Sequence, residues 1–399
     1  MSDNLAINGG SQAVRTPLNK YKWVDIGVMP EIENLILSNS FSGFLAQATP
    51  EHFGGPNVQN LEMEWSHKFD FKYSVSFNSW TSGLMAAVAS LNLEKDSEVI
   101  VTPWTMSATV ACIVANNLIP VFADIEEDTF NIDPIDVASK VTKKTSAILA
   151  VDIFGKPCNA PELSKVAKEN NLYLVVDSAQ TPRAKVKGKR SGNYSDISGY
   201  SLNRHKHIQV GEGGIAVTNN TEFAERLRLI RNHAEASSGV IQNQAITIGH
   251  NWRMGEIEAV LANYQLKSFD THIDHRFKSS VRLINLLSNL RGIELPKVLD
   301  KTQHDFYIIG IKLDKRLANQ REKIAKSLVA EGVPNLIVGY QALHRLNAFS
   351  NYRQDNLRIV EQMQDSTFLG LYMCGHYFTD LNITEIYQAF DKVLNYYYK

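Results

Sequence analysis

Residues 147–177 read AILAVDIFGKPCNAPELSKVAKENNLYLVVD and decide the fold class. Two apolar runs, 147–153 and 172–176, flank a stretch with helical texture at 161–171. Both runs are apolar nearly throughout rather than at every second position, which is typical of strands buried on both faces of a parallel sheet. A strand–helix–strand unit joins parallel neighbours. The stretch therefore predicts an α/β protein with a mostly parallel central sheet flanked by helices.

The same alternation extends toward the N-terminus. Residues 98–102 and 119–122 are short β-branched runs, and residues 84–93 and 107–117 have the texture of helices. Strands and helices that alternate over about 150 residues are what a doubly covered sheet requires.

The texture changes after about residue 221. A long helical stretch extends from about residue 255 to 290, and the last hundred residues mix strand and helix patterns. We therefore predict two domains: residues 1–268, a large domain with an N-terminal arm, and residues 269–399, a smaller α+β domain. The boundary is expected inside the long helix.

Composition excludes several classes of protein. The chain has 399 residues, 41 Lys+Arg against 42 Asp+Glu, and a formal net charge of −1, so it is no polybasic nucleic-acid binder. No stretch approaches the ~18 apolar residues of a membrane span. Cys112, Cys158 and Cys374 are far apart and form no CxxC pair, which argues against a disulfide scaffold or a cysteine zinc site. We expect a cytoplasmic protein without a metal.

Polar residues that follow the apolar runs are the first candidates for a site, because ligands of such sheets bind at the carboxyl ends of the strands. Asp124, Asp152, Asp177 and Ser201 take this position. Asp177 is followed three residues later by Gln180, and a carboxylate with a nearby amide can pair with a protonated ring nitrogen and its neighbouring hydroxyl. Taken alone, Asp177 could equally cap a turn or a helix.

Lys206 follows Ser201 by five residues in SLNRHKHIQVGEGG (201–214). A lysine that forms a Schiff base needs a fixed position and partial desolvation to lower its pKa. A lone lysine is more often a solvated surface charge. Here the glycines at 211–214 require a tight turn and suggest a close approach of backbone to backbone or ligand.

Two further stretches could bind a phosphate. Thr81 and Ser82 lie in NSWTSG (78–83), just before a helix expected from Leu84, and hydroxyls and amides at a helix N-terminus bind anions. Asn251 and Arg253 lie in GHNWRM (249–254), which opens the long helix. Capping and loop chemistry are the alternative roles. A lysine, a carboxylate and a phosphate cup together are the parts that a pyridoxal-phosphate enzyme requires.

With these motifs in this order, the sequence resembles the DegT/StrS family of sugar aminotransferases, which has the aspartate aminotransferase fold (PLP-transferase type I). The resemblance spans nearly the whole chain. Its segments are INGGSQAVRTPL (7–18), GGPNVQNLE (54–62), NSWTSGL (78–84), DSEVIVTPWTMSATV (96–110), PVFADIEEDTFNIDP (120–134), VDSAQ (176–180), SLNRHKHIQVGEGG (201–214) and GHNWRMGEIEA (249–259).

The resemblance implies a cofactor, pyridoxal 5'-phosphate, bound to Lys206 as a Schiff base. Lys206 would then move the substrate proton, and Asp177 would keep the pyridine nitrogen protonated, with Gln180 beside the ring. The phosphate would be bound by residues of one subunit and by Asn251 of its neighbour, which makes the active unit a homodimer. The phosphate-binding residues of the first subunit would be Thr81, Ser82 and Ser201.

Two departures from the family pattern concern the cofactor. An aromatic residue usually stacks on the ring where this chain has Met106, and Trp104 is the alternative stacking residue. Trp80 replaces a smaller residue and either narrows the pocket or packs away from it. Candidates to face the substrate are His207, Arg253, His304, His344 and the N-terminal segment 9–15.

The resemblance implies amino transfer from glutamate or glutamine to a nucleotide-linked keto-deoxy sugar for surface polysaccharide or lipopolysaccharide. A free keto sugar, a keto-octulosonate or an inosose is the alternative acceptor. In a related sugar dehydratase the lysine becomes histidine, and His205 and His207 flank Lys206, but the register of the motif favours Lys206. A silent binding protein or regulator, and a metal enzyme built on His205, His207, His304 and His344, have less support in the sequence.

Overall fold

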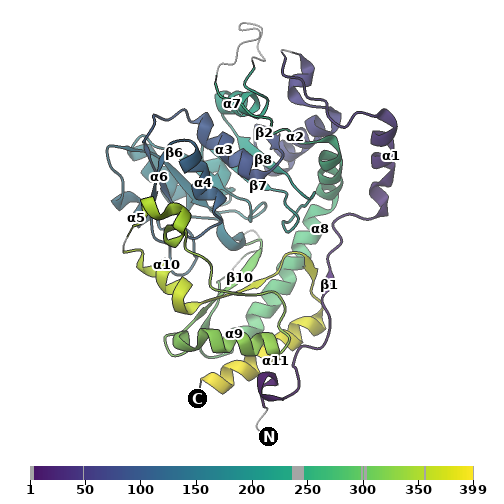
Figure 1. The fold of residues 1–399 in the computed structure, drawn as a ribbon. Coiled ribbons are helices and arrows are strands. Elements are labelled where there is room, and N and C mark those ends of the chain that lie inside the picture. The colour runs from purple at the N-terminus through teal and green to yellow at the C-terminus, as the bar shows by residue number, and fades with distance from the viewer. Residues whose placement is uncertain are drawn as a thin grey trace.

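The computed structural model describes residues 4–47, 49–235, 247–297, 300, 303–354 and 356–398. Its centre is a seven-stranded sheet in the order β2-β8-β7-β6-β5-β3-β4 (Figure 1). Neighbours in the part β7-β6-β5-β3-β4 pair in parallel, and β8 is antiparallel to both of its neighbours, β2 and β7. The predicted mostly parallel α/β sheet is therefore confirmed. The strands are β2 (Tyr73–Phe77), β3 (Glu98–Val101), β4 (Ile119–Phe122), β5 (Thr145–Val151), β6 (Tyr173–Asp177), β7 (Ile197–Ser201) and β8 (Gly214–Thr218).

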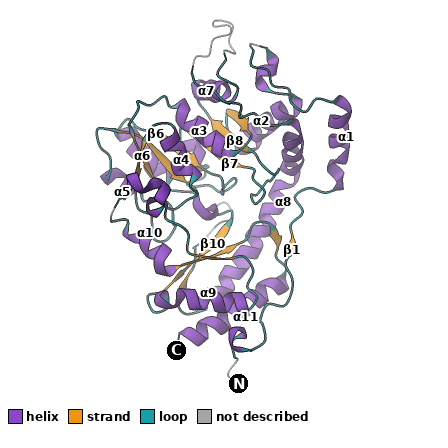
Figure 2. Cartoon of the chain, viewed as in Figure 1, coloured by secondary structure: helices purple, strands orange, loops and turns teal. Residues whose placement is uncertain are grey.

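Helices cover both faces of this sheet (Figure 2). Alternate residues of β5 show why its sequence is apolar without interruption: Leu149 and Val151 pack with one set of helices, and Ile148 and Ala150 pack with the other. The first set is α3 (Trp80–Ser90), α4 (Ala108–Ala115) and α7 (Thr221–Arg231); the second is α5 (Pro134–Ser139) and α6 (Ala160–Glu169).

A second unit contains a four-stranded antiparallel sheet in the order β11-β12-β10-β9. Its strands are β9 (Ile293–Glu294), β10 (Ile308–Leu313), β11 (Leu336–Val338) and β12 (Phe368–Tyr372), with helices α9 (Arg321–Ala330), α10 (Arg358–Gln362) and α11 (Asp380–Tyr397). The expected mixture of strands and helices in this part of the chain is present.

The long helix α8 (Glu256–Leu287) joins the two units and passes residue 268 without a break. Phe269 packs in one core with α2 (Pro56–Phe69), whereas Leu283 packs in another core with β10. The helix therefore contributes to both cores, and its contacts change from one to the other between Ile273 and Leu283.

The N-terminal segment packs with the second unit. Leu5 and Val14 are buried in its core, the Ala6 amide donates to Glu331 Oε1 over 2.8 Å, and β1 (Asn19–Lys20) pairs with β13 (His376–Tyr377). Both chain ends accordingly lie at the same end of the molecule (Figure 1). The chain then crosses to the first unit through α1 (Met29–Ser38).

One predicted boundary is wrong in an informative way. Helix α3 begins at Trp80 rather than Leu84, because the Ser79 hydroxyl accepts the Ser82 amide at 3.1 Å and caps the helix there. The cap is thus Ser79, not Thr81 or Ser82. Within the described ranges, no helix is long and apolar enough to cross a membrane.

Candidate active site

A cavity of about 330 Å³ opens at the carboxyl ends of β5, β6 and β7, where residues that begin β10 and end β12 face the central sheet. The predicted residues that line it are Thr81, Met106, Asp177, Gln180, Ser201 and Lys206. Six candidates from four separate motifs along the chain therefore meet at one cavity, on the sheet edge where ligands of such folds bind.

Lys206 lies in the loop that follows β7, and its side chain is buried with 9% of its surface exposed. Its backbone is fixed at both ends: the amide donates to the Asn203 carbonyl at 2.8 Å, and the carbonyl accepts the Trp23 indole N–H at 3.2 Å. Burial lowers the pKa of Lys206 to about 8, with Asp177 acting in the opposite direction. The Nζ atom lies 4.6 Å from the centre of the Tyr307 ring. The amine is thus held in place and more easily deprotonated than an ordinary lysine.

The glycine-rich turn after Lys206 brings two backbones together, as expected. A Cβ at Gly214 would lie 2.4 Å from the backbone nitrogen of Trp80, so only glycine lets β8 approach the start of α3 this closely. Gly211 has a φ of +91°, which disfavours other residues. The turn therefore places the lysine loop beside the N-terminus of α3.

Asp177 ends β6 and is 5% exposed. Its Oδ1 accepts the Trp80 indole N–H at 2.7 Å and the Ala179 amide at 3.1 Å, and its Oδ2 accepts the Thr109 hydroxyl at 3.2 Å. Burial raises the pKa of Asp177, and these hydrogen bonds and Lys206 oppose that rise. The carboxylate is held by three donors at the cavity wall and can accept one more from inside the cavity.

The start of α3 forms the second end of the cavity. Ser79 and Thr81 line it, and the Ser82 hydroxyl lies 3.0 Å from the Ser79 hydroxyl rather than in the lining. Free amides of the first turn and the helix dipole favour an anion at this point, and Ser201 lines the cavity as well. Ser79 is a functional candidate that the sequence analysis did not select.

Gln180 and three tyrosines shape the rest of the cavity. The Gln180 Oε1 atom accepts the Phe154 amide at 2.7 Å, and its side chain also hydrogen-bonds the Tyr340 hydroxyl. Tyr307, Tyr340 and Tyr372 line the cavity from the second unit. Tyr307 and Tyr372 were missed, since no sequence pattern marks them.

The two candidates for ring stacking have different environments. Met106 is 64% exposed and lines the cavity. Trp104 is fully buried and does not line the cavity. The centre of its ring lies 5.5 Å from the ring centres of Tyr340 and Phe368.

The structure places five other predicted residues outside this cavity. Three of them are histidines. His207 is buried and stacked on Tyr307, His344 is buried beside Glu361 with 3.1 Å between Nε2 and Oε1, and His304 lies in another cavity. The expected contact of these side chains with a substrate is therefore not provided within one chain. His205, which the sequence analysis considered only as a possible cofactor-site or metal residue, lines the cavity instead.

Asn251 and Arg253 also lie elsewhere. Asn251 pairs with Asn232 in an isolated β-bridge, and the Arg253 Nε atom donates to Asn232 Oδ1 at 2.8 Å. Neither residue lines the cavity of its own chain. No group of three or more potential metal ligands gathers among the described residues.

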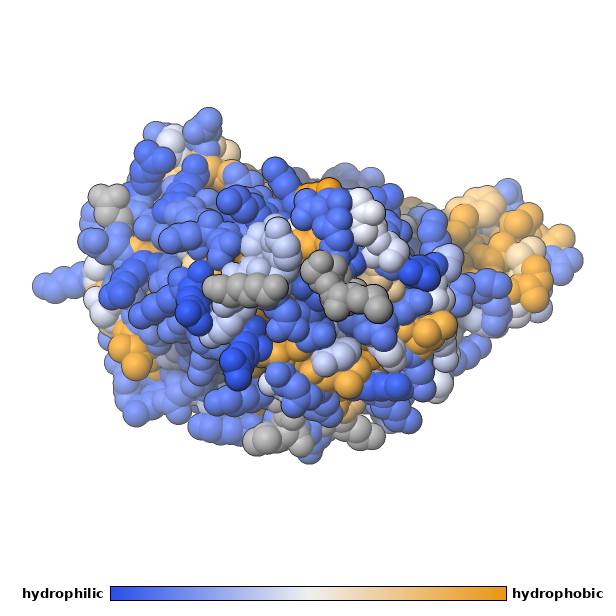
Figure 3. Space-filling view, turned by 90° about the horizontal axis from the view of Figure 1, so that it is seen from below, coloured by the Kyte–Doolittle hydropathy of each residue, from blue (hydrophilic) through white to orange (hydrophobic). Residues whose placement is uncertain are grey.

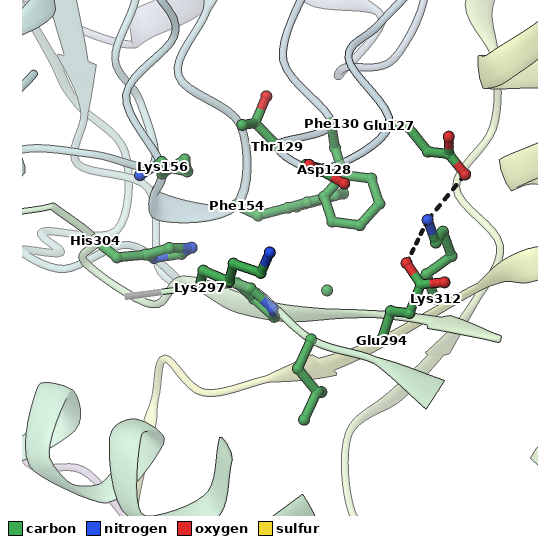
Figure 4. Close-up of a pocket in the computed structure, with 13 residues that line it drawn as sticks. Glu127, Asp128, Thr129, Phe130, Phe154, Lys156, Glu294, Lys297, His304 and Lys312 are labelled. Carbon is green, nitrogen blue, oxygen red and sulfur yellow. Dashed lines mark hydrogen bonds and ion pairs between the residues drawn. The ribbon is translucent and has the colours of Figure 1, made fainter. Parts of the chain in front are cut away.

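A larger cavity, of about 460 Å³, lies between the loop after β4 and the β9–β10 region. Figure 4 shows Lys312 between Glu127 and Glu294, at 2.8 and 2.6 Å, with Lys156, Lys297 and His304 at the other end. Phe130 and Phe154 form part of its wall. Its central lysine is ion-paired with two carboxylates that are 54 and 60% exposed, whereas Lys206 and Asp177 are both buried, so the chemistry points to the smaller cavity.

Comparisons with known proteins identify the family of the chain. Residues 45–371 match the model of the DegT/DnrJ/EryC1/StrS aminotransferase family. The chain is 28% identical to a GDP-perosamine synthase of Caulobacter vibrioides, over 85% of this chain and 91% of that protein. It is similar to the structure of an aminotransferase from Psychrobacter cryohalolentis, with a TM-score of 0.86, 24% identity, and coverage of 96% and 100%. It is also similar to DesI, solved with its TDP-sugar product, with a TM-score of 0.82, 26% identity, and coverage of 97% and 95%.

Proposed function

The chain belongs to the DegT/DnrJ/EryC1/StrS aminotransferase family, and on that premise we propose that it moves an amino group from glutamate to a keto group of a nucleotide-linked deoxy sugar. The general activity, PLP-dependent amino transfer, follows from the family. The acceptor is supported by a perosamine synthase among the relatives and by the TDP-sugar complex of DesI. A free keto sugar, a keto-octulosonate or an inosose is the second candidate acceptor.

One observation carries the proposal: Lys206 and Asp177 are both buried in the wall of one cavity, and each influences the pKa of the other. A buried amine without an ion-pair partner within 4.0 Å among the described residues is costly to keep charged. Its natural use is as a nucleophile.

The residues present fit pyridoxal 5'-phosphate. The cofactor, when bound, supplies an aldehyde for a lysine amine and a ring that takes up electrons from the reacting carbon. Lys206 would hold it, Asp177 would face its ring nitrogen, and the start of α3 with Ser79, Thr81 and Ser201 would bind its phosphate. Gln180 would lie by the ring hydroxyl.

Residues of the chain would then supply the nucleophile, carry the proton and stabilise the charge on the cofactor ring. With a pKa of about 8, roughly a tenth of Lys206 is neutral at pH 7, so the amine can both attack a carbonyl and return to carry a proton. The Asp177 carboxylate stabilises a positive charge at the ring nitrogen. Tyr307, Tyr340 and Tyr372 restrict the space in front of the lysine and limit water.

The direct test is an absorbance spectrum of the purified protein with pyridoxal phosphate, before and after glutamate. We expect a band near ~410–430 nm that moves to ~330 nm with glutamate, followed by a screen of keto-sugar acceptors. A band that no amino donor moves would contradict the transaminase and favour the dehydratase or a silent binding protein.

We also propose that the active unit is a homodimer with shared sites. Asn251 lies outside the cavity of its own chain, so it can serve a cavity only across a subunit boundary. The segment around α1 carries exposed apolar side chains, including Ile26, Ile36 and Leu37 at 81, 59 and 76% exposure. Figure 3 shows apolar surface gathered on this projecting arm, which favours a second copy as its cover.

Coexpression of Lys206→Ala with Asn251→Ala chains tests the shared site. Each single variant is expected to be inactive or weak, but a mixed dimer regains one intact site, so activity should recover to about a quarter of the wild-type value. No recovery, in a preparation shown by light scattering and mass to contain mixed dimers, would contradict sharing.

A further inference from the structure

Trp80 is the residue whose role the sequence left open, and the structure shows what it contacts. It is the first residue of α3, is 4% exposed, and its indole N–H donates to Asp177 Oδ1 at 2.7 Å. This is the shortest of the three hydrogen bonds that the Asp177 carboxylate accepts. Trp80 therefore lines the cavity rather than packing outward, and its polar edge faces the carboxylate.

The fold makes a specific place for this ring. A Cβ at Gly199 of β7 would lie 2.0 Å from the Trp80 Cη2 atom, and one at Gly83 would lie 2.6 Å from its Cε3 atom. Neither position could carry a side chain without moving the indole. Two glycines on different elements thus hold the ring in the orientation that points its N–H at Asp177.

The hydrogen bond also matters for the charge of Asp177. Burial raises the pKa of this carboxyl, and the Trp80 hydrogen bond is the largest influence in the opposite direction. Trp80, Thr109 and the Ala179 amide occupy three of about four acceptor positions on the carboxylate. One position remains, and Trp80 helps to decide where it points.

We propose that Trp80 is a positioning residue for the cofactor: through its indole N–H it fixes the Asp177 carboxylate so that its free acceptor position meets a protonated ring nitrogen. The inference rests on the proposed function, in which Asp177 pairs with that nitrogen. It assigns Trp80 a role that acts through Asp177 and requires no contact of the indole with the substrate.

The test compares two cofactors. Apoenzyme is titrated, by absorbance, with pyridoxal phosphate and with its 1-deaza analogue, in which carbon replaces the ring nitrogen. In Trp80→Phe, which keeps an aromatic ring and removes the N–H, we expect affinity for pyridoxal phosphate to fall about tenfold and affinity for the analogue to stay within twofold. A variant with benzothienylalanine at position 80 keeps the indole shape and should show the same selective loss.

A matched control is Trp65→Phe. Trp65 is 1% exposed, and its indole nitrogen has no hydrogen-bond partner among the described residues. Its replacement should leave the ratio of the two affinities unchanged. Thermal melting of each variant checks the fold.

The pH dependence gives a second readout. The Trp80 hydrogen bond opposes the rise in the pKa of Asp177, so its removal should make pyridoxal phosphate binding weaken at a higher pH than in the wild type as the solution is acidified. Lys206 also becomes protonated on acidification, and the 1-deaza analogue, which shares the lysine but not the pairing with Asp177, corrects for that contribution.

The outcomes separate the two hypotheses. Equal loss of affinity for both cofactors in Trp80→Phe and in the benzothienylalanine variant would mean that Trp80 only fills the core, and would overturn the inference. If the wild type itself binds both cofactors equally, the pairing of Asp177 with the ring nitrogen fails, and the inference falls with that part of the proposed function.

Discussion

Two of the cavities in the described part of the chain differ in how their lysines are paired with carboxylates. The larger one, about 460 Å³, places Lys312 between Glu127 and Glu294, so its central cation is neutralised. The smaller one, about 330 Å³, holds Lys206 without an ion-pair partner within 4.0 Å among the described residues, and Asp177 with donors on both oxygens. The larger of these two cavities is therefore not the one that the chemistry selects. Buried ionisable groups that do not form an ion pair with each other, here Lys206 and Asp177, indicate the reactive cavity.

The largest difference in turnover is expected between variants at lysines of the two cavities, Lys206 and Lys156. Lys206→Ala should abolish the ~410–430 nm band and reduce turnover by on the order of 10⁴-fold or more, because the nucleophile and proton carrier is removed. Lys156→Ala is the matched control, since burial lowers the pKa of Lys156 too but in the larger cavity. It should keep turnover within about twofold. Steady-state rates and absorbance spectra of both variants are compared, and circular dichroism checks that both are folded. Full activity in Lys206→Ala would contradict the role of Lys206.

The next effect concerns two buried strand-end carboxylates. Asp177→Asn should retain the cofactor and lose about 10²-fold in turnover, since an amide cannot balance a protonated ring nitrogen. Asp152 directly follows the neighbouring strand β5. Its oxygens accept the Cys158 amide and the Ser178 hydroxyl, and it does not line the cavity. Asp152→Asn should therefore lower the melting temperature and leave the turnover of the folded fraction unchanged. Equal kinetic losses in both variants would contradict the assignment.

The pH dependence sharpens the account of Lys206. With a pKa of about 8, the neutral, reactive amine increases about tenfold per pH unit well below 8, reaches about half of the total at pH 8 and at most doubles above it. Capture of pyridoxal phosphate by apoenzyme should accelerate in the same way and level off by about pH 9. Stopped-flow absorbance between pH 6.5 and 9.5 measures this. A rate that keeps rising beyond pH 9 would indicate an ordinary, solvated lysine.

The smallest effect is expected in the larger cavity. Glu127→Gln removes one of two carboxylates from Lys312, and Glu127 is itself 54% exposed. Ion pairs of this kind contribute about 0–1 kcal/mol. Chemical denaturation should show a free energy of unfolding lowered by no more than that, and turnover should be unchanged. A large loss of turnover would show that the two cavities are coupled.

Much of the site could be predicted because its residues follow strands. Asp177, Ser201 and Lys206 come at or just after the ends of β6 and β7, and parallel strands bring their carboxyl ends to one edge. Of the three predicted hydroxyls, Thr81 and Ser201 line the cavity, whereas that of Ser82 lies beside Ser79. The helix start was misjudged because a cap by Ser79 and a turn by Thr81 look alike in sequence.

The remaining residues depend on tertiary packing. Tyr307 and Tyr372 reach the cavity from the second unit, at the start of β10 and the end of β12, and no local pattern links them to β6. His205 and His207 flank Lys206 symmetrically in sequence, but only His205 lines the cavity, because the loop turns between them. The hydrogen bond of Trp80 to Asp177 spans 97 positions and rests on space left by Gly199.

The central claim is that Lys206 binds the cofactor, and borohydride reduction tests it most directly. Reduction of the protein with bound pyridoxal phosphate converts the Schiff base into a stable secondary amine, and peptide mass spectrometry then locates the modified lysine. The account predicts modification on the peptide that contains Lys206, and none there after prior treatment with glutamate. Modification at Lys156 or another lysine, with Lys206 unmodified, would contradict it.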